Sequence, residues 1–144
     1  MTRRPAFWRA LLWTVMLPAI LHAGCTGPDG LNVDGTWSGT WHFVASGLNV
    51  TDQVTATLSQ NGTRASGLWT AESGASGQLD FNAMGTTSGT LTINQATLTT
   101  QSCNATTTFQ GTVTDTHIDI TMADIPPAGI CQWGTGSRFV LDKQ

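Results

Sequence analysis

The side chains able to do acid–base or metal chemistry are few in this sequence and are not grouped as an active site requires. Glu72 is the only glutamate, so no pair of glutamates can act as general acid and base. His42 and His117 lack neighbouring cysteines or glutamates at the spacing of zinc ligands. Asp115, His117 and Asp119 alternate, a pattern that suits a weak cation site but more often marks the solvated face of a hairpin. We therefore expect no enzyme activity, no cofactor and no metal ion.

The three cysteines carry the most reactive chemistry in the chain, and the first of them follows a distinctive N-terminal segment. Three arginines precede the uncharged run 10–21, which is the layout of an export signal. A membrane-spanning helix needs about 20 apolar residues. Pro18 and His22 interrupt the run before that length, so the segment predicts export rather than permanent spanning.

The residues around Cys25 resemble the lipobox of bacterial lipoproteins. In that family a leucine three residues before the cysteine is followed by small residues, and the cysteine is acylated on sulfur and becomes the new N-terminus. Ala23, Gly24 and Cys25 fit this pattern, whereas His22 stands where the leucine is expected and Leu21 lies one position earlier. The alternative is an ordinary secretory signal cleaved nearby, which leaves Cys25 as a thiol.

The lipoprotein resemblance implies a division of the chain and a location. Residues 1–24 are the signal peptide, 25–34 the lipidated N-terminus and a short tether, and 35–144 a single domain. The membrane is then a partner through the N-terminal lipid. Thr26 occupies the position where an aspartate resembles an inner-membrane retention signal, which favours the outer membrane, facing the periplasm or the cell surface.

The odd number of cysteines agrees with lipidation of Cys25. Three cysteines in an exported chain leave one unpaired. If Cys25 carries lipid, Cys103 and Cys131 can form a disulfide. Closing that loop of roughly 28 residues adds about 3 to 4 kcal/mol in the chain-entropy model.

Composition excludes one class of partner. Residues 25–144 contain three cations, Arg64, Arg138 and Lys143, against nine carboxylates, a formal charge of about −6. Such a balance argues against nucleic acid as a partner.

The hydrophobic pattern after residue 34 has period two and is divided by glycine-rich turns. We expect strands at 35–44, 50–60 and 63–70, with a tight hairpin turn at Asn61-Gly62 between the second and the third. Further strands follow, while 94–102 carries no clear pattern. The expected inward residues are Trp37, Trp41, Phe43, Val50, Val54, Ala56, Leu58, Ala65, Trp69, Leu79, Phe81, Ala83, Leu91, Ile93, Ala105, Thr107, Phe109, Val113, Ile118, Ile120, Met122, Phe139 and Leu141.

Eight antiparallel strands in sequence can close on themselves and so remove exposed sheet edges. The predicted fold is therefore all-β, an up-and-down β-barrel of about eight strands. Gly35-Thr36-Trp37 resembles the Gly-x-Trp that opens the barrel of lipocalins and other calycins, and Arg138 resembles the arginine that packs over that tryptophan. The other interpretation of Trp37 is an ordinary core residue.

Two functions follow from an eight-stranded barrel, which is just wide enough for one small ligand or for a filling of side chains. In the first, the barrel binds a small apolar molecule in a site that is lined by Trp41, Trp69, Phe81 and Phe109. In the second, these side chains fill the barrel, and the protein is a non-enzymatic structural or interaction module. Glycine and alanine on the inner faces favour space, whereas the aromatic residues favour filling. The sequence does not indicate an oligomeric state.

Overall fold

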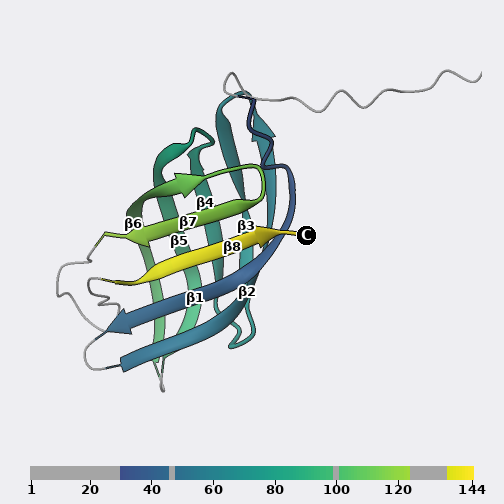
Figure 1. The fold of residues 1–144 in the computed structure, drawn as a ribbon. Coiled ribbons are helices and arrows are strands. Elements are labelled where there is room, and N and C mark those ends of the chain that lie inside the picture. Colours follow the sequence, from purple (N-terminus) through teal and green to yellow (C-terminus); the bar gives the residue numbers. More distant parts are fainter. Residues whose placement is uncertain (1–29, 46–47, 99–100, 124–135) are drawn as a thin grey trace, which may run out of the picture.

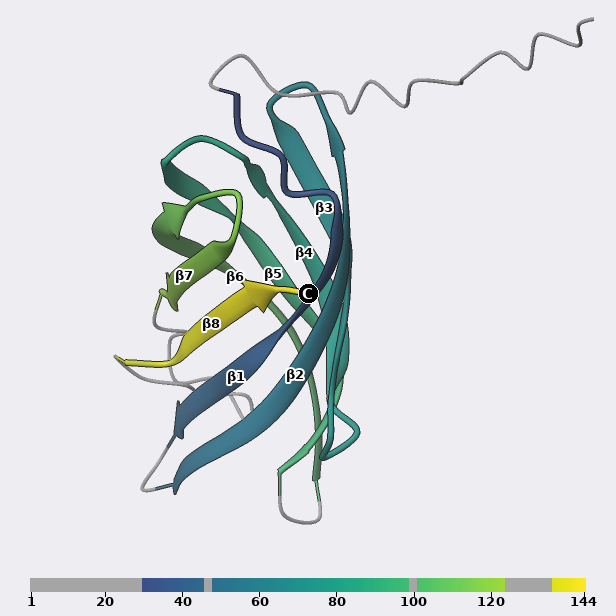
Figure 2. The ribbon, with the colours of Figure 1, turned by 45° about the vertical axis from the view of Figure 1, so that its right-hand side comes forward.

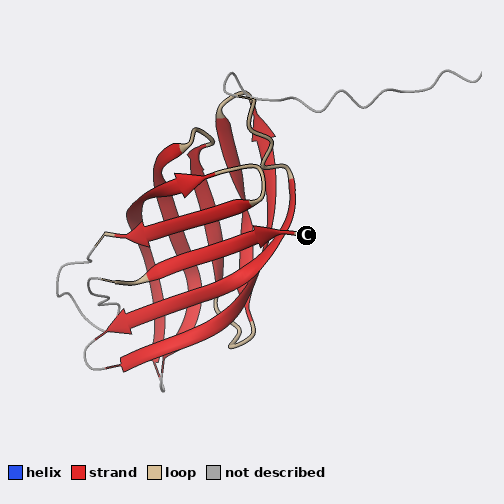
Figure 3. Cartoon of the chain, in the orientation of Figure 1, coloured by secondary structure: helices blue, strands red, loops and turns tan. Residues whose placement is uncertain are grey.

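The computed structural model describes residues 30–45, 48–98, 101–123 and 136–144. These residues form one closed barrel of eight antiparallel strands, each paired with its neighbours in sequence (Figures 1 and 3). The strands are β1 (Gly35–Ala45), β2 (Leu48–Asn61), β3 (Arg64–Ala71), β4 (Ser76–Asn82), β5 (Thr86–Leu98), β6 (Gln101–Val113), β7 (His117–Met122) and β8 (Arg138–Lys143). Within the described ranges no helix is long and apolar enough to cross a membrane.

Closure comes from pairing of β1 with both β2 and β8, so Trp41 lies opposite Asp52 on one side and Phe139 on the other. Alternation places apolar residues inside and threonine-rich sequence outside, because successive side chains of a strand point to opposite faces. In β3, for example, Ala65 and Trp69 are buried while Leu68 is exposed. The predicted fold class is confirmed.

Two local predictions differ from the structure. Val50 has the parity of Val54, but it lies near the start of β2 and 40% of its surface is exposed, so burial of the inner face does not reach that end of the strand. The tight turn between β2 and β3 is one residue later than expected. Asn61 pairs with Arg64, and the turn residues are Gly62, with φ +61°, and Thr63. A positive φ at the first turn position is what glycine supplies in a type II′ hairpin.

The stretch 94–102, which has no clear pattern in the sequence, contains strand backbone. β5 continues to Leu98 and β6 begins at Gln101, with a shift of register between Ile93 and Ala96. A shift of this kind breaks the period-two alternation, because one extra residue moves the following side chains to the opposite face.

The inner-face glycines do not create space, which corrects the expectation drawn from their size. At Gly67 an added Cβ would lie 1.9 Å from the carbonyl oxygen of Thr57 on β2, and at Gly111 it would lie 2.0 Å from that of Asp119 on β7. Gly39, Gly77 and Gly89 have comparable contacts with their neighbouring strands. These glycines let backbones approach closely where strands bend in a small barrel.

The two ends of the barrel differ. At one end lie the turns 62–63, 83–85 and 114–116 together with residues 30–34, which run beside the ends of β2 and β3 (Figure 2). We call residues 30–34 the strap and this end the strapped end. We call the opposite end the far end. The strands that finish there are β1, β3, β5 and β7.

Candidate functional site

The inside of the barrel near the far end is occupied by four aromatic side chains, which we call the four-ring cluster. Trp41 and Trp69 meet edge to face with ring centroids 5.3 Å apart. Phe139 stacks on Trp41 at 5.8 Å and meets Trp69 edge to face at 5.1 Å. Phe43 contacts Trp41 at 5.3 Å, also edge to face. These are preferred geometries of aromatic pairs, which gain about 0.5 to 1.5 kcal/mol beyond their burial.

A second aromatic pair packs across β5. Phe81 on β4 and Phe109 on β6 both lie opposite Gly89 in the strand register, and their ring centroids are 6.1 Å apart. A Cβ at Gly89 would come within 2.8 Å of the Phe109 ring, so glycine makes room for the pair. The four predicted lining residues therefore form two groups, Trp41 with Trp69 and Phe81 with Phe109.

The exposure of these side chains shows how full the barrel is. Trp69, Phe139 and Leu79 have at most 1% of their surface exposed, and Trp41 has 3%. A cavity wide enough for a water molecule would add accessible surface to the side chains that line it. The described interior around the four-ring cluster is therefore packed with side chains, as is usual for protein cores.

Among the described residues, two polar atoms in this packed interior have no hydrogen-bond partner. The indole Nε1 atoms of Trp41 and Trp69 are buried, and neither has a hydrogen-bond acceptor among the described residues. By contrast, Nε1 of Trp37 donates to the carbonyl oxygen of Val33 at 2.9 Å. Leaving a buried donor unpaired costs about 1 to 3 kcal/mol, so the aromatic packing must more than offset this cost.

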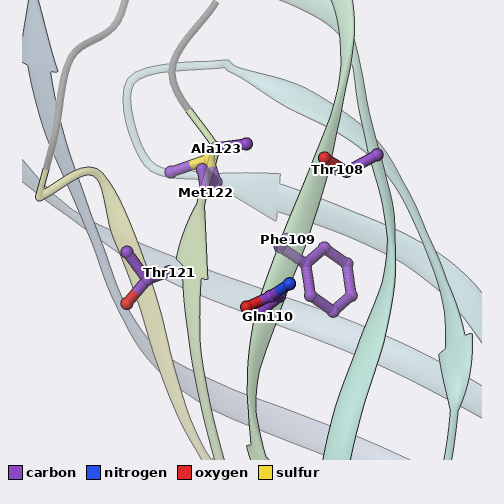
Figure 4. A pocket seen from close by; sticks show the side chains of 6 residues that line it. All are labelled: Thr108, Phe109, Gln110, Thr121, Met122 and Ala123. Atoms are coloured by element: carbon purple, nitrogen blue, oxygen red, sulfur yellow. The ribbon is translucent and has the colours of Figure 1, made fainter.

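One hollow of about 330 Å³ opens at the last residues of β7, where they pair with β6 (Figure 4). Its volume is at the lower end of the range for small-molecule sites. Its walls are Thr108, Phe109, Gln110, Thr121, Met122 and Ala123. Phe109 and Met122 are only 1% and 3% exposed, so most of the apolar surface that a ligand would meet comes from carbon atoms of the other wall residues.

The strapped end is closed by polar contacts that centre on Gln60. This side chain is nearly buried and lies on the inner face of β2. Its Oε1 accepts from the amide of Val33 at 2.8 Å, and its Nε2 donates to the carbonyl oxygens of Leu31 and Gly62. Val33 itself is fully buried. The strap therefore covers the interior beside Gln60 at this end.

The cation over the Trp37 ring is Lys143, whose Nζ lies 5.7 Å from the ring centroid. Arg138, predicted to pack there, lies instead on the outer face of β8 and forms a two-pronged ion pair with Asp119 of β7. The prediction for Arg138 is wrong because its position in β8 has the parity of the solvent face. Trp37 is a fully buried core residue.

The acidic and histidine side chains of β7 are engaged in pairs rather than in a metal cluster. Asp119 is held by Arg138, and Nδ1 of His117 lies 2.7 Å from Asp142. Across the part of the chain that the structure describes, no group of three or more histidine, cysteine or acidic side chains could hold a metal ion.

The pair on β7 and β8 gives a pH prediction. Hydrogen bonds from Arg138 lower the pKa of Asp119 below its ordinary value, an effect that partial burial opposes and the charges of Arg138 and His117 reinforce. Because the pKa of Asp119 is lower in the folded than in the unfolded protein, its carboxylate stabilises the fold at pH values above the unfolded pKa. This contribution is lost as the pH falls through the folded pKa. Arg138→Gln should therefore raise the pKa of Asp119 and lower stability at neutral pH by no more than about 1 kcal/mol, as for other surface pairs.

An NMR titration of the Asp119 carboxyl group, with urea unfolding at neutral and low pH, measures both effects. Arg64→Gln is the control, because Arg64 pairs with Asp80 on a different wall and should leave the titration of Asp119 unchanged. An unaltered Asp119 titration in Arg138→Gln would show that the pair does not form in solution.

The predicted roles of the cysteines fall mostly outside the described residues. Cys25 and Cys131 lie outside the described residues, and Cys103 is in β6 with its backbone opposite Ala96. Lipidation of Cys25 and the Cys103–Cys131 disulfide therefore remain predictions.

Several residues that shape the interior are absent from the predicted site. Phe43 and Phe139 complete the four-ring cluster, although the sequence identifies both only as inward-facing. Gln60 has the parity of Ala56 and Leu58, and a polar residue on an apolar face is the available signal for a specific hydrogen-bonding role.

Comparison of the chain with protein-family models, with curated proteins and with solved structures found no match.

Proposed function

We propose that this protein is a lipid-anchored, non-enzymatic interaction module of the bacterial cell envelope, with a filled barrel as its rigid scaffold. The observation that carries the proposal is the packed four-ring cluster of Trp41, Phe43, Trp69 and Phe139. A ligand held in the manner of lipocalins, the family that Gly35-Thr36-Trp37 resembles, would have to displace these rings. Partner contacts are therefore assigned to the outside of the barrel. The proposal puts them at the far end, where the hollow beside β7 lies, because the strap covers part of the other end.

A second function, binding of a small apolar ligand, is supported by the hollow beside β7. A ligand there would rest over Phe109 and Met122 without entering the four-ring cluster. The small exposure of both side chains limits the apolar contact they offer. This location would replace the interior site expected from Trp41 and Trp69.

The anchoring part of the proposal rests on the export signal and on Ala23-Gly24-Cys25. One acyl chain gives only marginal membrane binding, whereas the several chains of a bacterial lipoprotein resist removal by salt. The proposed location is the outer membrane, facing the periplasm or the cell surface.

Cys25→Ser should transfer the protein from the membrane fraction to the soluble fraction, because the acylated sulfur is lost. Cell fractionation with a high-salt wash, followed by mass spectrometry of the N-terminus, measures this. Cys131→Ser is the control and should stay with the membrane. An unmodified mature N-terminus at another residue would contradict the anchoring.

Partner binding is tested by cross-linking from a photoreactive residue at Ser73, in the turn at the far end, in cells expressing the full chain. Adducts from Ser73 but not from Leu68, on the outer wall of β3, support an interaction module with contacts at the far end. Equal adduct patterns from both positions would contradict that assignment.

A further inference from the structure

The strap ties the N-terminal side of the chain to one end of the barrel through contacts with three separate elements. The amide of Asn32 donates to Oδ1 of Asp115, in the β6–β7 turn, at 2.6 Å. The carbonyl oxygen of Asn32 accepts from Nζ of Lys143, in β8, at 2.8 Å. On β2, Gln60 binds the strap through Leu31 and Val33. The direction from which the chain enters the barrel is therefore fixed.

The burial of the strap adds to these hydrogen bonds. Val33 is fully buried, and its carbonyl oxygen accepts from the indole of Trp37. Releasing the strap would expose Val33 and leave the Gln60 amide and the Trp37 indole without these partners. Each buried group left unpaired costs about 1 to 3 kcal/mol, so the docked strap is the stable state.

The length of chain between the strap and Cys25 limits how far the barrel can lie from an anchor. Five Cα–Cα steps separate Cys25 from Gly30, which span at most about 19 Å. The 14 residues of β2 extend about 44 Å along the strand. With a strand tilt near 45°, the barrel is roughly 30 Å tall. The tether is therefore shorter than the barrel.

We infer that the strapped end of the barrel faces the lipid surface in which the acyl chains of Cys25 are inserted, and that the far end points away from it. This inference rests on the proposed lipid anchoring. The strapped end also carries Met84, a large apolar side chain that is 41% exposed in the turn between β4 and β5. Val50 at the far end is exposed to the same degree, so the orientation rests on the length of the tether and not on exposed apolar side chains.

The orientation decides how partners reach the protein. The hollow beside β7 and the turn 72–75 belong to the far end. A partner that binds there approaches from the aqueous side. A lipid of the anchoring membrane would first have to leave the bilayer and travel the height of the barrel.

Energy transfer to labelled lipid headgroups tests the orientation. The acylated protein is purified from membranes and reconstituted in phosphatidylethanolamine and phosphatidylglycerol vesicles that contain a headgroup acceptor dye. A genetically encoded fluorescent amino acid replaces Met84 at the strapped end in one variant and Ser73 at the far end in the other. We expect severalfold greater transfer from position 84 than from position 73 at the same acceptor density.

Inserting 20 glycine and serine residues between Asp29 and Gly30 provides the control. A flexible linker of this length has an r.m.s. span of about 25 Å, comparable to the barrel height, so the difference between the two positions should be largely lost. Equal or reversed transfer in the acylated protein with its native tether would overturn the orientation and leave the anchoring intact. Absence of acyl chains from the purified protein would overturn both.

Discussion

Trp69→Ala is expected to lower the free energy of unfolding by about 3 kcal/mol, because the packed interior cannot collapse fully around the missing indole. Truncation of a buried aromatic side chain typically costs 3 to 5 kcal/mol. The lower part of this range applies here because the substitution also removes an indole N–H that has no acceptor among the described residues. Urea unfolding followed by circular dichroism measures the change.

Leu68→Ala is the matched control, since Leu68 is the adjacent residue of β3 and is 65% exposed. Its effect should stay within about 0.5 kcal/mol, as for other surface substitutions. A loss below about 1 kcal/mol in Trp69→Ala would mean that the ring borders open space, which contradicts a filled barrel.

Gly67→Ala is expected to destabilise the barrel by about 3 kcal/mol or more, at or above the upper end of the usual cost of overpacking. The atoms that meet the added Cβ are the backbone carbonyl of Thr57 and the Cα of Leu58, at 1.9 and 2.9 Å. No rotamer change can relieve contacts with backbone, so β2 and β3 would have to separate.

Gly85→Ala provides the comparison, because an added Cβ there meets nothing within 4 Å. The same unfolding measurement should find this variant close to the parent protein. Similar stabilities for Gly67→Ala and Gly85→Ala would show that β2 and β3 are not in the close contact that the structure describes.

The fold could be predicted from sequence because one physical rule, alternation about a half-buried strand, acts on almost every residue. Trp37, Trp41 and Trp69 each share parity with small or apolar neighbours, and all three are buried. The rule gives a wrong or incomplete strand where the alternation itself is interrupted. At the register shift between Ile93 and Ala96 the alternation is interrupted, so the length of β5 was not predicted.

The candidate site was less predictable, because the alternation along a strand indicates which face of the sheet a side chain lies on. It does not indicate which side chains of different strands contact each other. The small size of Gly67 and Gly111 predicts open space inside the barrel, whereas in the structure these glycines allow neighbouring backbones to come into close contact. The partner of Trp37 depends on the register between β1 and β8, which places Lys143 opposite it and turns Arg138 outward. Neither result follows from local sequence.

The identity of the four-ring cluster also required the register. Trp41 and Phe139 lie opposite each other only in the closing pair of β1 with β8. Trp69 joins them across the interior from β3.

The most direct test of the filled barrel is a titration of the protein with the apolar probe 1-anilinonaphthalene-8-sulfonate, observed through the indole N–H resonances of Trp41 and Trp69 in ¹H–¹⁵N NMR spectra. Both atoms are buried within the cluster. We predict that neither resonance shifts at any probe concentration that leaves the protein folded. Binding in the hollow beside β7 would instead shift the amide resonances of residues such as Gln110 and Thr121 while the indoles stay unchanged. A saturable shift of the Trp41 and Trp69 indole resonances would contradict the account, because it would place a ligand inside the barrel.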